Sequence, residues 1–157
     1  MNASNKIVSR AALVHLLKKK RHKKIVFTNG CFDLLHAGHV TLLEKSRRLG
    51  DLLIVGLNSD ASVRRIKGPK RPLVNEKLRA KVLAGLSCVD YVTLFPEDTP
   101  LETIRMLRPA VLVKGGDYDL SQIVGRGEVK KVARVPLVKN LSTTKLIQKI
   151  IAAYGGK

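Results

Sequence analysis

The residues with the clearest chemical potential lie in one stretch, Thr28-Asn29-Gly30-Cys31-Phe32-Asp33-Leu34-Leu35-His36-Ala37-Gly38-His39. It leads from a short β-branched run, 24–29, to a helical pattern that starts near Val40. Backbone N–H groups at a helix N-terminus, aided by the helix dipole, attract an anion. The glycines allow close backbone approach, and the two imidazoles can point into the same site. The pattern therefore predicts a nucleotide phosphate site.

Two other interpretations of the histidine pair stay open at this point. Cys31, His36 and His39 could be zinc ligands. A structural zinc site usually needs four protein ligands, however, and His15 and His22 offer no obvious fourth. The pair could also be structural, with both imidazoles hydrogen-bonded inside a turn.

The order of apolar and amphipathic segments predicts the fold that positions this stretch. Apolar runs typical of buried strands occur at 24–29, 52–57, 91–95, 110–113 and, more weakly, 132–138. Helical patterns follow the cap candidate Ser9 and then occur at 40–49, 76–86, 101–107 and from Thr143 or Thr144 to about Ala153. Strands alternating with helices predict a doubly wound, Rossmann-like α/β domain of about five parallel strands.

The length of the chain favours a single domain. We expect one domain over residues 1–157, because 157 residues suffice for one core but not comfortably for two. Residues 1–23 would form an N-terminal helix and basic segment, and 24–154 the α/β core. The segment 67–72 is rich in Lys, Arg, Gly and Pro and predicts a basic loop.

Two further polar groups follow predicted strands. In a doubly wound sheet the ligand binds beyond the carboxyl ends of the strands, near the point where strand order reverses. Asn58-Ser59-Asp60 and Lys114-Gly115-Gly116-Asp117 both follow apolar runs. Asn58 and Asp60 could contact a base or ribose, although the same residues could cap a helix. The glycines between Lys114 and Asp117 permit close approach of a nucleotide to the backbone.

The charge of the chain indicates anionic ligands. Thirty Lys and Arg against 12 Asp and Glu give a net charge of +18, which suits DNA, RNA and nucleotide phosphates alike. The densest cluster, Lys18 to Lys24, could contact nucleic acid or simply be the solvated end of a helix. Aromatic residues make up 4% of the chain and Trp is absent, so a protein that stacks single-stranded bases is not expected.

The remaining composition predicts a cytoplasmic protein. No apolar run reaches the roughly 18 residues of a membrane span, and MNASNKIVSR lacks the apolar core of a secretory signal. We therefore expect no membrane partner. Cys31 and Cys88 have no CxxC partner, which predicts two reduced thiols, with Cys31 structural rather than nucleophilic.

Three motifs carry a resemblance to a known family. His36-Ala37-Gly38-His39 fits an HxGH signature, and Gly30-Cys31-Phe32-Asp33 before it fits GxFD. Ser142-Thr143-Thr144-Lys145 fits an STT motif that precedes the last helix. Together they span most of the chain and resemble the cytidylyltransferase-like nucleotidylyltransferases.

Within that family the chain is most similar to the D-glycero-β-D-manno-heptose 1-phosphate adenylyltransferase domain of ADP-heptose synthase. The similar pieces are residues 27–33, 55–62, Arg71-Pro72 followed by Arg79, and 113–118. The resemblance implies transfer of AMP from ATP to heptose 1-phosphate with release of pyrophosphate, as a step toward lipopolysaccharide. Mg²⁺ is the expected cofactor, held largely by the triphosphate and water. A homodimer is plausible for so small a domain.

The reaction requires charge stabilisation on transferring and leaving oxygens, so His36 and His39 are candidates to hydrogen-bond the phosphates. By resemblance, Arg79 is a triphosphate ligand rather than a surface charge, and Lys67 or its neighbour Arg65 neutralises the leaving group. Asp33 could orient the acceptor's hydroxyls or cap a turn. Expected nucleotide contacts are Thr28, Asn29, Gly30, Cys31, Phe32, Gly38, Asn58, Asp60, Lys114, Gly115, Asp117, Ser142, Thr143 and Thr144.

Two departures bear on alternative functions. The alternative within the family is a cytidylyltransferase for glycerol 3-phosphate or another alcohol phosphate. That branch carries Arg-Thr-Glu-Gly before STT, where this chain has residues 137–141, Leu-Val-Lys-Asn-Leu. Residues 125–132 are also shorter than in typical heptose enzymes, which affects the expected acceptor site. A non-catalytic nucleic-acid-binding protein on the same fold is the alternative from another class.

Overall fold

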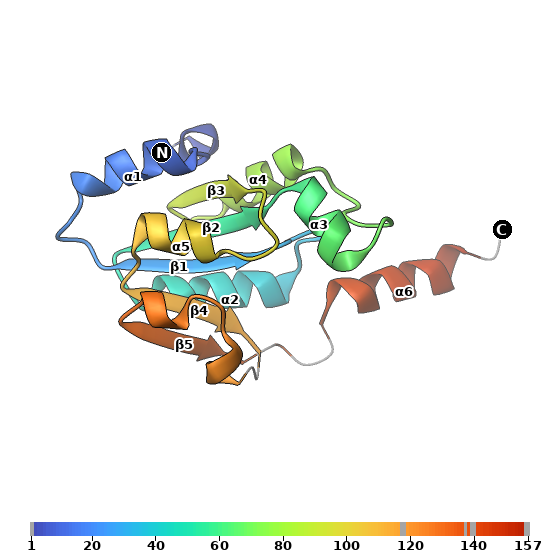
Figure 1. Cartoon of the computed structure of the whole chain (residues 1–157). Coiled ribbons are helices and arrows are strands. Elements are labelled where there is room, and N and C mark those ends of the chain that lie inside the picture. The colour runs from blue at the N-terminus through green and yellow to red at the C-terminus, as the bar shows by residue number, and fades with distance from the viewer. Residues whose placement is uncertain (1, 117–118, 137, 139–140, 156–157) are drawn as a thin grey trace.

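The computed structural model describes residues 2–116, 119–136, 138 and 141–155. Within these residues, five parallel strands form one sheet in the order β3-β2-β1-β4-β5 (Figure 1). The strands are β1 (Ile25–Gly30), β2 (Leu52–Asn58), β3 (Tyr91–Phe95), β4 (Val111–Gly115) and β5 (Lys131–Val135). The predicted fold class is confirmed, and strand order reverses between β1 and β4.

Helices cover both faces of the sheet. One face is covered by α1 (Arg10–Lys18) and α5 (Leu101–Leu107), the other by α2 (Ala37–Arg47) and α4 (Glu76–Gly85). The helix α3 (Asp60–Lys67) follows β2, and α6 (Thr143–Tyr154) extends away from the sheet (Figure 1). Short 3-10 helices lie at η1 (Ala3–Lys6), η2 (Leu120–Gln122) and η3 (Arg126–Glu128).

The strands contribute side chains to two hydrophobic cores, one on each face of the sheet, because successive side chains of a strand point to opposite faces. Val26 and its neighbours in the sheet pack with Leu43 of α2 and Leu83 of α4. Phe27, one residue further along β1, lies in the second core with Leu13 of α1. Both faces of β1 are thus buried, which fixes its carboxyl end at the centre of the molecule.

Capping side chains explain where several helices begin. The predicted cap Ser9 accepts a hydrogen bond from the N–H of Ala12, at 3.3 Å, and α1 begins at the next residue. Ser59 likewise accepts from Ser62 and starts α3, a helix that the apolar pattern did not predict. The capping interpretation of the 58–60 segment is therefore confirmed for Ser59.

Two segments differ in length from the predicted ones. The weak apolar run at 132–138 forms a strand only over Lys131–Val135. In the short segment 125–132, a single 3-10 turn, η3, precedes this strand. None of the helices in the described part of the chain combines the length and apolarity needed to cross a bilayer.

Candidate functional site

A cavity of about 560 Å³ lies at the carboxyl ends of β1 and β4, where strand order reverses. This is the position at which doubly wound sheets bind ligands. Segments from the whole chain contribute to its wall: Asn29–Asp33, His39, Leu42, Asn58, Ile66, Lys67, Arg71, Asp98–Pro100, Lys114, Gly115, Gln122–Val124, Thr143 and Thr144.

The histidine pair stands at the start of α2. His36 is the N-cap residue of that helix, and its ring stacks on His39 with centroids 3.8 Å apart and an interplanar angle of 21°. Phe32 also packs against His39, with ring centroids 5.2 Å apart and an interplanar angle of 59°. A Cβ at Gly38 would lie only 3.0 Å from Cε1 of His36, so a side chain there would crowd the His36 ring. The HxGH spacing thus lets the two rings stack.

Both imidazoles are neutral at pH 7 in the free protein. Burial, and to a lesser extent the neighbouring His36, lowers the pKa of His39 to about 4. Burial also lowers the pKa of His36. The Nδ1 atoms of both rings are buried and have no hydrogen-bond partner among the described residues. Buried polar atoms without partners are uncommon in folded proteins.

Lys114 brings a cation to the same cavity from the end of β4. Its Nζ donates a hydrogen bond to Oδ1 of Asn29, at the end of the adjacent strand β1. Burial lowers the pKa of Lys114 to about 8, so the ammonium is charged at neutral pH and loses its proton within an accessible pH range.

The carboxylate of Asp33 holds a distant loop in place. Its oxygens accept hydrogen bonds from the backbone N–H groups of Leu73 and Val74, and Arg71 pairs with it at 2.5 Å. The side chain of Asp33 is fully buried. Burial alone would raise the pKa of Asp33, but these three donors outweigh burial and lower it. Asp33 therefore clamps the basic loop and does not cap its own turn.

The clamp gives the first testable prediction. We expect Asp33→Asn to reduce the free energy of unfolding at pH 7 by about 1.5–3 kcal/mol, because hydrogen bonds to a charged group are weakened. The lowered pKa means that the stabilisation is present above pH ~3.9 and lost as pH falls through the folded-state value. The difference in the free energy of unfolding between wild type and Asp33→Asn should therefore become smaller below about pH 4.

Urea unfolding at several pH values measures this effect. Glu44→Gln, which removes an exposed carboxylate outside the cavity, is the matched control and should change stability by at most about 0.5 kcal/mol. Equal stability of Asp33→Asn and wild type at pH 7 would contradict the clamp.

Arg79 is buried and does not line the cavity. Its guanidinium donates to the backbone oxygens of Cys31, Asn58 and Val74 and pairs with Asp60 at 2.6 Å. The interpretation of Arg79 as a surface charge is wrong, because only 2% of the residue is exposed. As a direct triphosphate ligand Arg79 remains a prediction. In this structure it connects the loops after β1 and β2 to α4.

The other predicted residues divide into two groups. Twelve of those named above line the cavity: Asn29, Gly30, Cys31, Phe32, Asp33, His39, Asn58, Lys67, Lys114, Gly115, Thr143 and Thr144. Thr28 lies in the sheet, where its hydroxyl donates to Val113, and Ser142 caps α6 by accepting from Lys145. Arg65 pairs with Asp98 at the surface. Asp117 lies outside the described residues.

Five parts of the wall were not predicted. Leu42 and Ile66 lie on α2 and α3, Arg71 belongs to the basic loop, 98–100 follow β3, and 122–124 begin at the last residue of η2. The rule that sites lie after strand ends would have found 98–100 had it been applied to β3. No sequence signal identifies 122–124, which joins the last residue of η2 to two apolar residues. Across the described residues, no three His, Cys, Asp or Glu side chains are grouped to hold a metal ion.

Comparison with known proteins finds one matching family model and several relatives that share one name. A family model described as "Cytidylyltransferase-like" matches residues 27–150. "Bifunctional protein HldE" of Geobacter sulfurreducens is 58% identical over 142 residues, covering 88% of this chain and 29% of that protein. The protein of the same name from Trichlorobacter lovleyi is 54% identical over 159 residues, covering 98% of this chain and 32% of the relative. The chain thus spans about a third of the length of these relatives.

A solved structure shares the fold. The lipopolysaccharide core biosynthesis protein from Thermoplasma volcanium superposes with a TM-score of 0.65 at 28% sequence identity. The match covers 74% of this chain and 99% of that one.

Proposed function

We propose, from the premise that this chain belongs to the cytidylyltransferase-like family, that it transfers AMP from ATP to D-glycero-β-D-manno-heptose 1-phosphate. The products would be ADP-heptose and pyrophosphate. The observation that carries the proposal is the stacked pair of neutral histidines, with unpartnered buried nitrogens, at the cavity where the sheet reverses strand order.

The reaction is a single in-line displacement. A phosphate oxygen of the sugar phosphate forms a bond to the α-phosphorus of ATP, and the bond from that phosphorus to the bridging oxygen breaks. The electron pair leaves with pyrophosphate, so negative charge grows on the leaving oxygens. The protein supplies position and electrostatic stabilisation, and no covalent intermediate is required.

The histidines are suited to stabilise this charge. A neutral imidazole, already stripped of water, can donate a hydrogen bond without first losing a hydration shell. His39 lines the cavity and His36 stacks directly on it. Thr143 and Thr144, which also line the cavity, can present hydroxyls and N–H groups from the first turn of α6.

Two lysines would neutralise the phosphates from different sides. Lys114 is fixed by Asn29 at the sheet, whereas Lys67 is the exposed last residue of α3, next to a loop. We expect Lys67 to reach the leaving pyrophosphate. Mg²⁺ would arrive with ATP, bound by phosphate oxygens and water, as that ion keeps several waters.

In this proposal Asp33 positions a loop, whereas the sequence suggested a contact with the acceptor. Its carboxylate is occupied by Arg71 and the backbone of Leu73 and Val74. We therefore assign it to positioning the basic loop over the cavity, and not to direct contact with the acceptor's hydroxyls. The choice of heptose as acceptor rests on the sequence resemblance.

Pyrophosphate release tests the proposal directly. ATP or CTP would be combined with Mg²⁺ and either heptose 1-phosphate or glycerol 3-phosphate in all four pairings. Release only with ATP and heptose 1-phosphate is the expected result. Release with CTP and glycerol 3-phosphate would instead assign the chain to the alcohol-phosphate branch, and silence in every pairing would contradict nucleotidyl transfer to these acceptors.

The pKa of Lys114 predicts how ATP binding depends on pH. Below about pH 8 the ammonium is charged and attracts the triphosphate; above it the amine is neutral. We therefore expect the affinity of the free protein for ATP to fall by up to about tenfold per pH unit above pH 8.

Calorimetric titration of ATP between pH 7 and pH 9 measures this loss. Lys114→Met should bind ATP more weakly at pH 7 and lose the pH dependence. Lys77→Met, which removes an exposed lysine of α4 away from the cavity, should match wild type at every pH. A wild-type affinity that stays constant through pH 8 would contradict the role of Lys114.

A further inference from the structure

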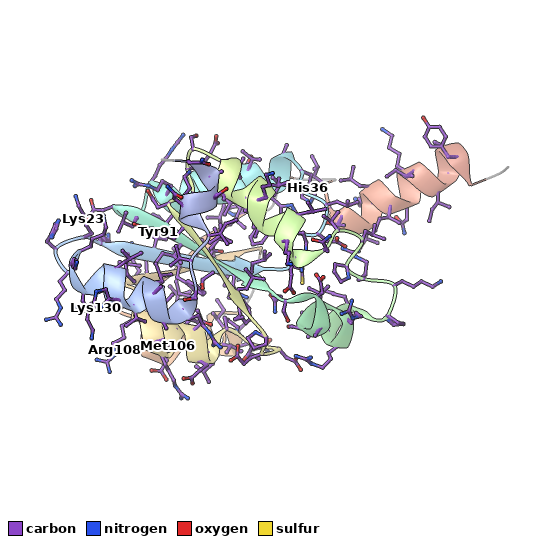
Figure 2. All side chains as sticks on the ribbon, turned by 90° about the horizontal axis from the view of Figure 1, so that it is seen from above. Lys23, His36, Tyr91, Met106, Arg108 and Lys130 are labelled. Carbon is purple, nitrogen blue, oxygen red and sulfur yellow. The ribbon has the colours of Figure 1, made fainter. Side chains whose placement is uncertain are left out.

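A second cavity, of about 870 Å³, lies at the opposite edge of the sheet, where the strands begin. Ile25 is the first residue of β1, and Ala110 and Lys130 directly precede β4 and β5. Leu17 of α1 and Met106 of α5 contribute to its apolar walls. Figure 2 shows Lys23, Met106, Arg108 and Lys130 at the end of the molecule away from His36.

The lining of this cavity is strongly basic. Six cationic side chains line it: Lys18, Arg21, Lys23, Arg105, Arg108 and Lys130. Glu128 is the single carboxylate in the lining, and Arg105 already binds it at 2.9 Å. Within the described residues, Lys18, Arg21, Arg108 and Lys130 form no ion pair. The cavity thus keeps a large uncompensated positive charge.

Helix ends account for only part of this charge. Both α1 and α5 end at the cavity, and the negative end of a helix dipole attracts cations such as Lys18 and Arg108. Arg21, Lys23 and Lys130 lie outside any helix, in the segments that lead into β1 and β5. Cations gathered from three distant parts of the chain repel one another unless an anion binds between them.

We propose that this second cavity binds a small organic anion that carries two or more phosphate groups. Its volume lies within the roughly 300–1,000 Å³ of small-molecule sites. Cations from three segments of the lining, 18–23, 105–108 and 130, can bind different phosphates, while apolar residues such as Leu17 and Met106 can contact an organic body. No aromatic residue is in the lining, so the cavity lacks the stacking surface of a single-strand nucleic-acid site.

The site is separate from the proposed catalytic one. The catalytic cavity lies at the carboxyl ends of the strands and this one at their amino ends. β1 joins them, with Ile25 in one lining and Asn29 and Gly30 in the other. Neither set of residues contributes to the other cavity, so occupancy of each can be followed on its own.

Backbone amide NMR of the whole chain, titrated with inorganic tripolyphosphate, tests the proposal. We expect saturable shifts at 18–25, 105–110 and 128–130, distinct from any shifts at 29–39 and 114–116. Arg21→Ala/Arg108→Ala/Lys130→Ala should weaken binding at the first set by at least about tenfold. The control Arg48→Ala/Lys77→Ala/Lys81→Ala removes the same charge from exposed positions outside both cavities and should bind as wild type.

Three outcomes would overturn the proposal. Shifts confined to the catalytic cavity would show that tripolyphosphate binds only there. Equal weakening in the two triple variants would show an effect of net charge alone. A short single-stranded RNA that perturbs residues 18–25 at far lower concentrations than tripolyphosphate would show a nucleic-acid surface. The NMR shifts are read without ATP, sugar phosphate or turnover, so this test does not depend on the proposed reaction.

Discussion

Replacing His39 with alanine is expected to lower the rate of pyrophosphate release by about 10²–10³-fold, the usual loss of one preorganised transition-state donor. The effect should fall mainly on kcat, because charge on the transferring group develops only in the transition state. His36→Ala should have a similar effect. Because the two rings stack at 3.8 Å, the double variant should lose less than the product of the two single losses.

The pH profile separates this role from general base catalysis. The pKa of His39 is lowered to about 4, so this ring stays neutral near pH 7. We therefore expect kcat/KM to show no ionisation of His39 between pH 6 and pH 7.5.

Exposed His15 on α1 provides the matched control, and His15→Ala should retain wild-type rates. Thermal unfolding of each variant must show a folded protein. A folded His39→Ala protein with unchanged kcat would exclude the histidine from the chemistry.

Arg79→Ala is expected to reduce the free energy of unfolding by at least about 3 kcal/mol. The substitution leaves three backbone oxygens, on Cys31, Asn58 and Val74, without their donor. It also removes the ion-pair partner of Asp60 and empties a fully buried volume. The loops that carry the catalytic residues would lose their common support.

Urea denaturation measures this loss, with exposed Arg48→Ala as the control that should stay within about 0.5 kcal/mol of wild type. Arg79→Lys keeps the charge but not the planar fork, so it should recover only a small part of the stability. Wild-type stability of Arg79→Ala, combined with a large loss of ATP affinity, would instead support a direct phosphate ligand.

The sheet and the cavity edge could be predicted from sequence because both depend on local patterns. Each apolar run became a strand, and the HxGH stretch lies at the reversal of strand order. The helix α3 was not predicted because Val63 and Ile66 are its only large apolar residues, so its pattern is polar. Its cap, Ser59, and the acidic residue after it, Asp60, were the available signals.

The roles of Asp33 and Arg79 could not be predicted for a different reason. Asp33 binds backbone groups 40 and 41 residues away, and Arg79 binds one 48 residues away. Backbone N–H and C=O groups carry no sequence identity, so no pattern of residue types reveals such pairs. Charged side chains near a site are therefore easily assigned to the ligand when the fold itself uses them.

The helix α6 connects ligand binding to local order. Thr143 and Thr144 line the catalytic cavity, yet none of the 12 residues of α6 is buried. An isolated helix of this length is only marginally stable in water. When a ligand binds the first turn of α6, part of the binding free energy offsets the cost of ordering this helix. The measured affinity is therefore lower than the contacts alone would give.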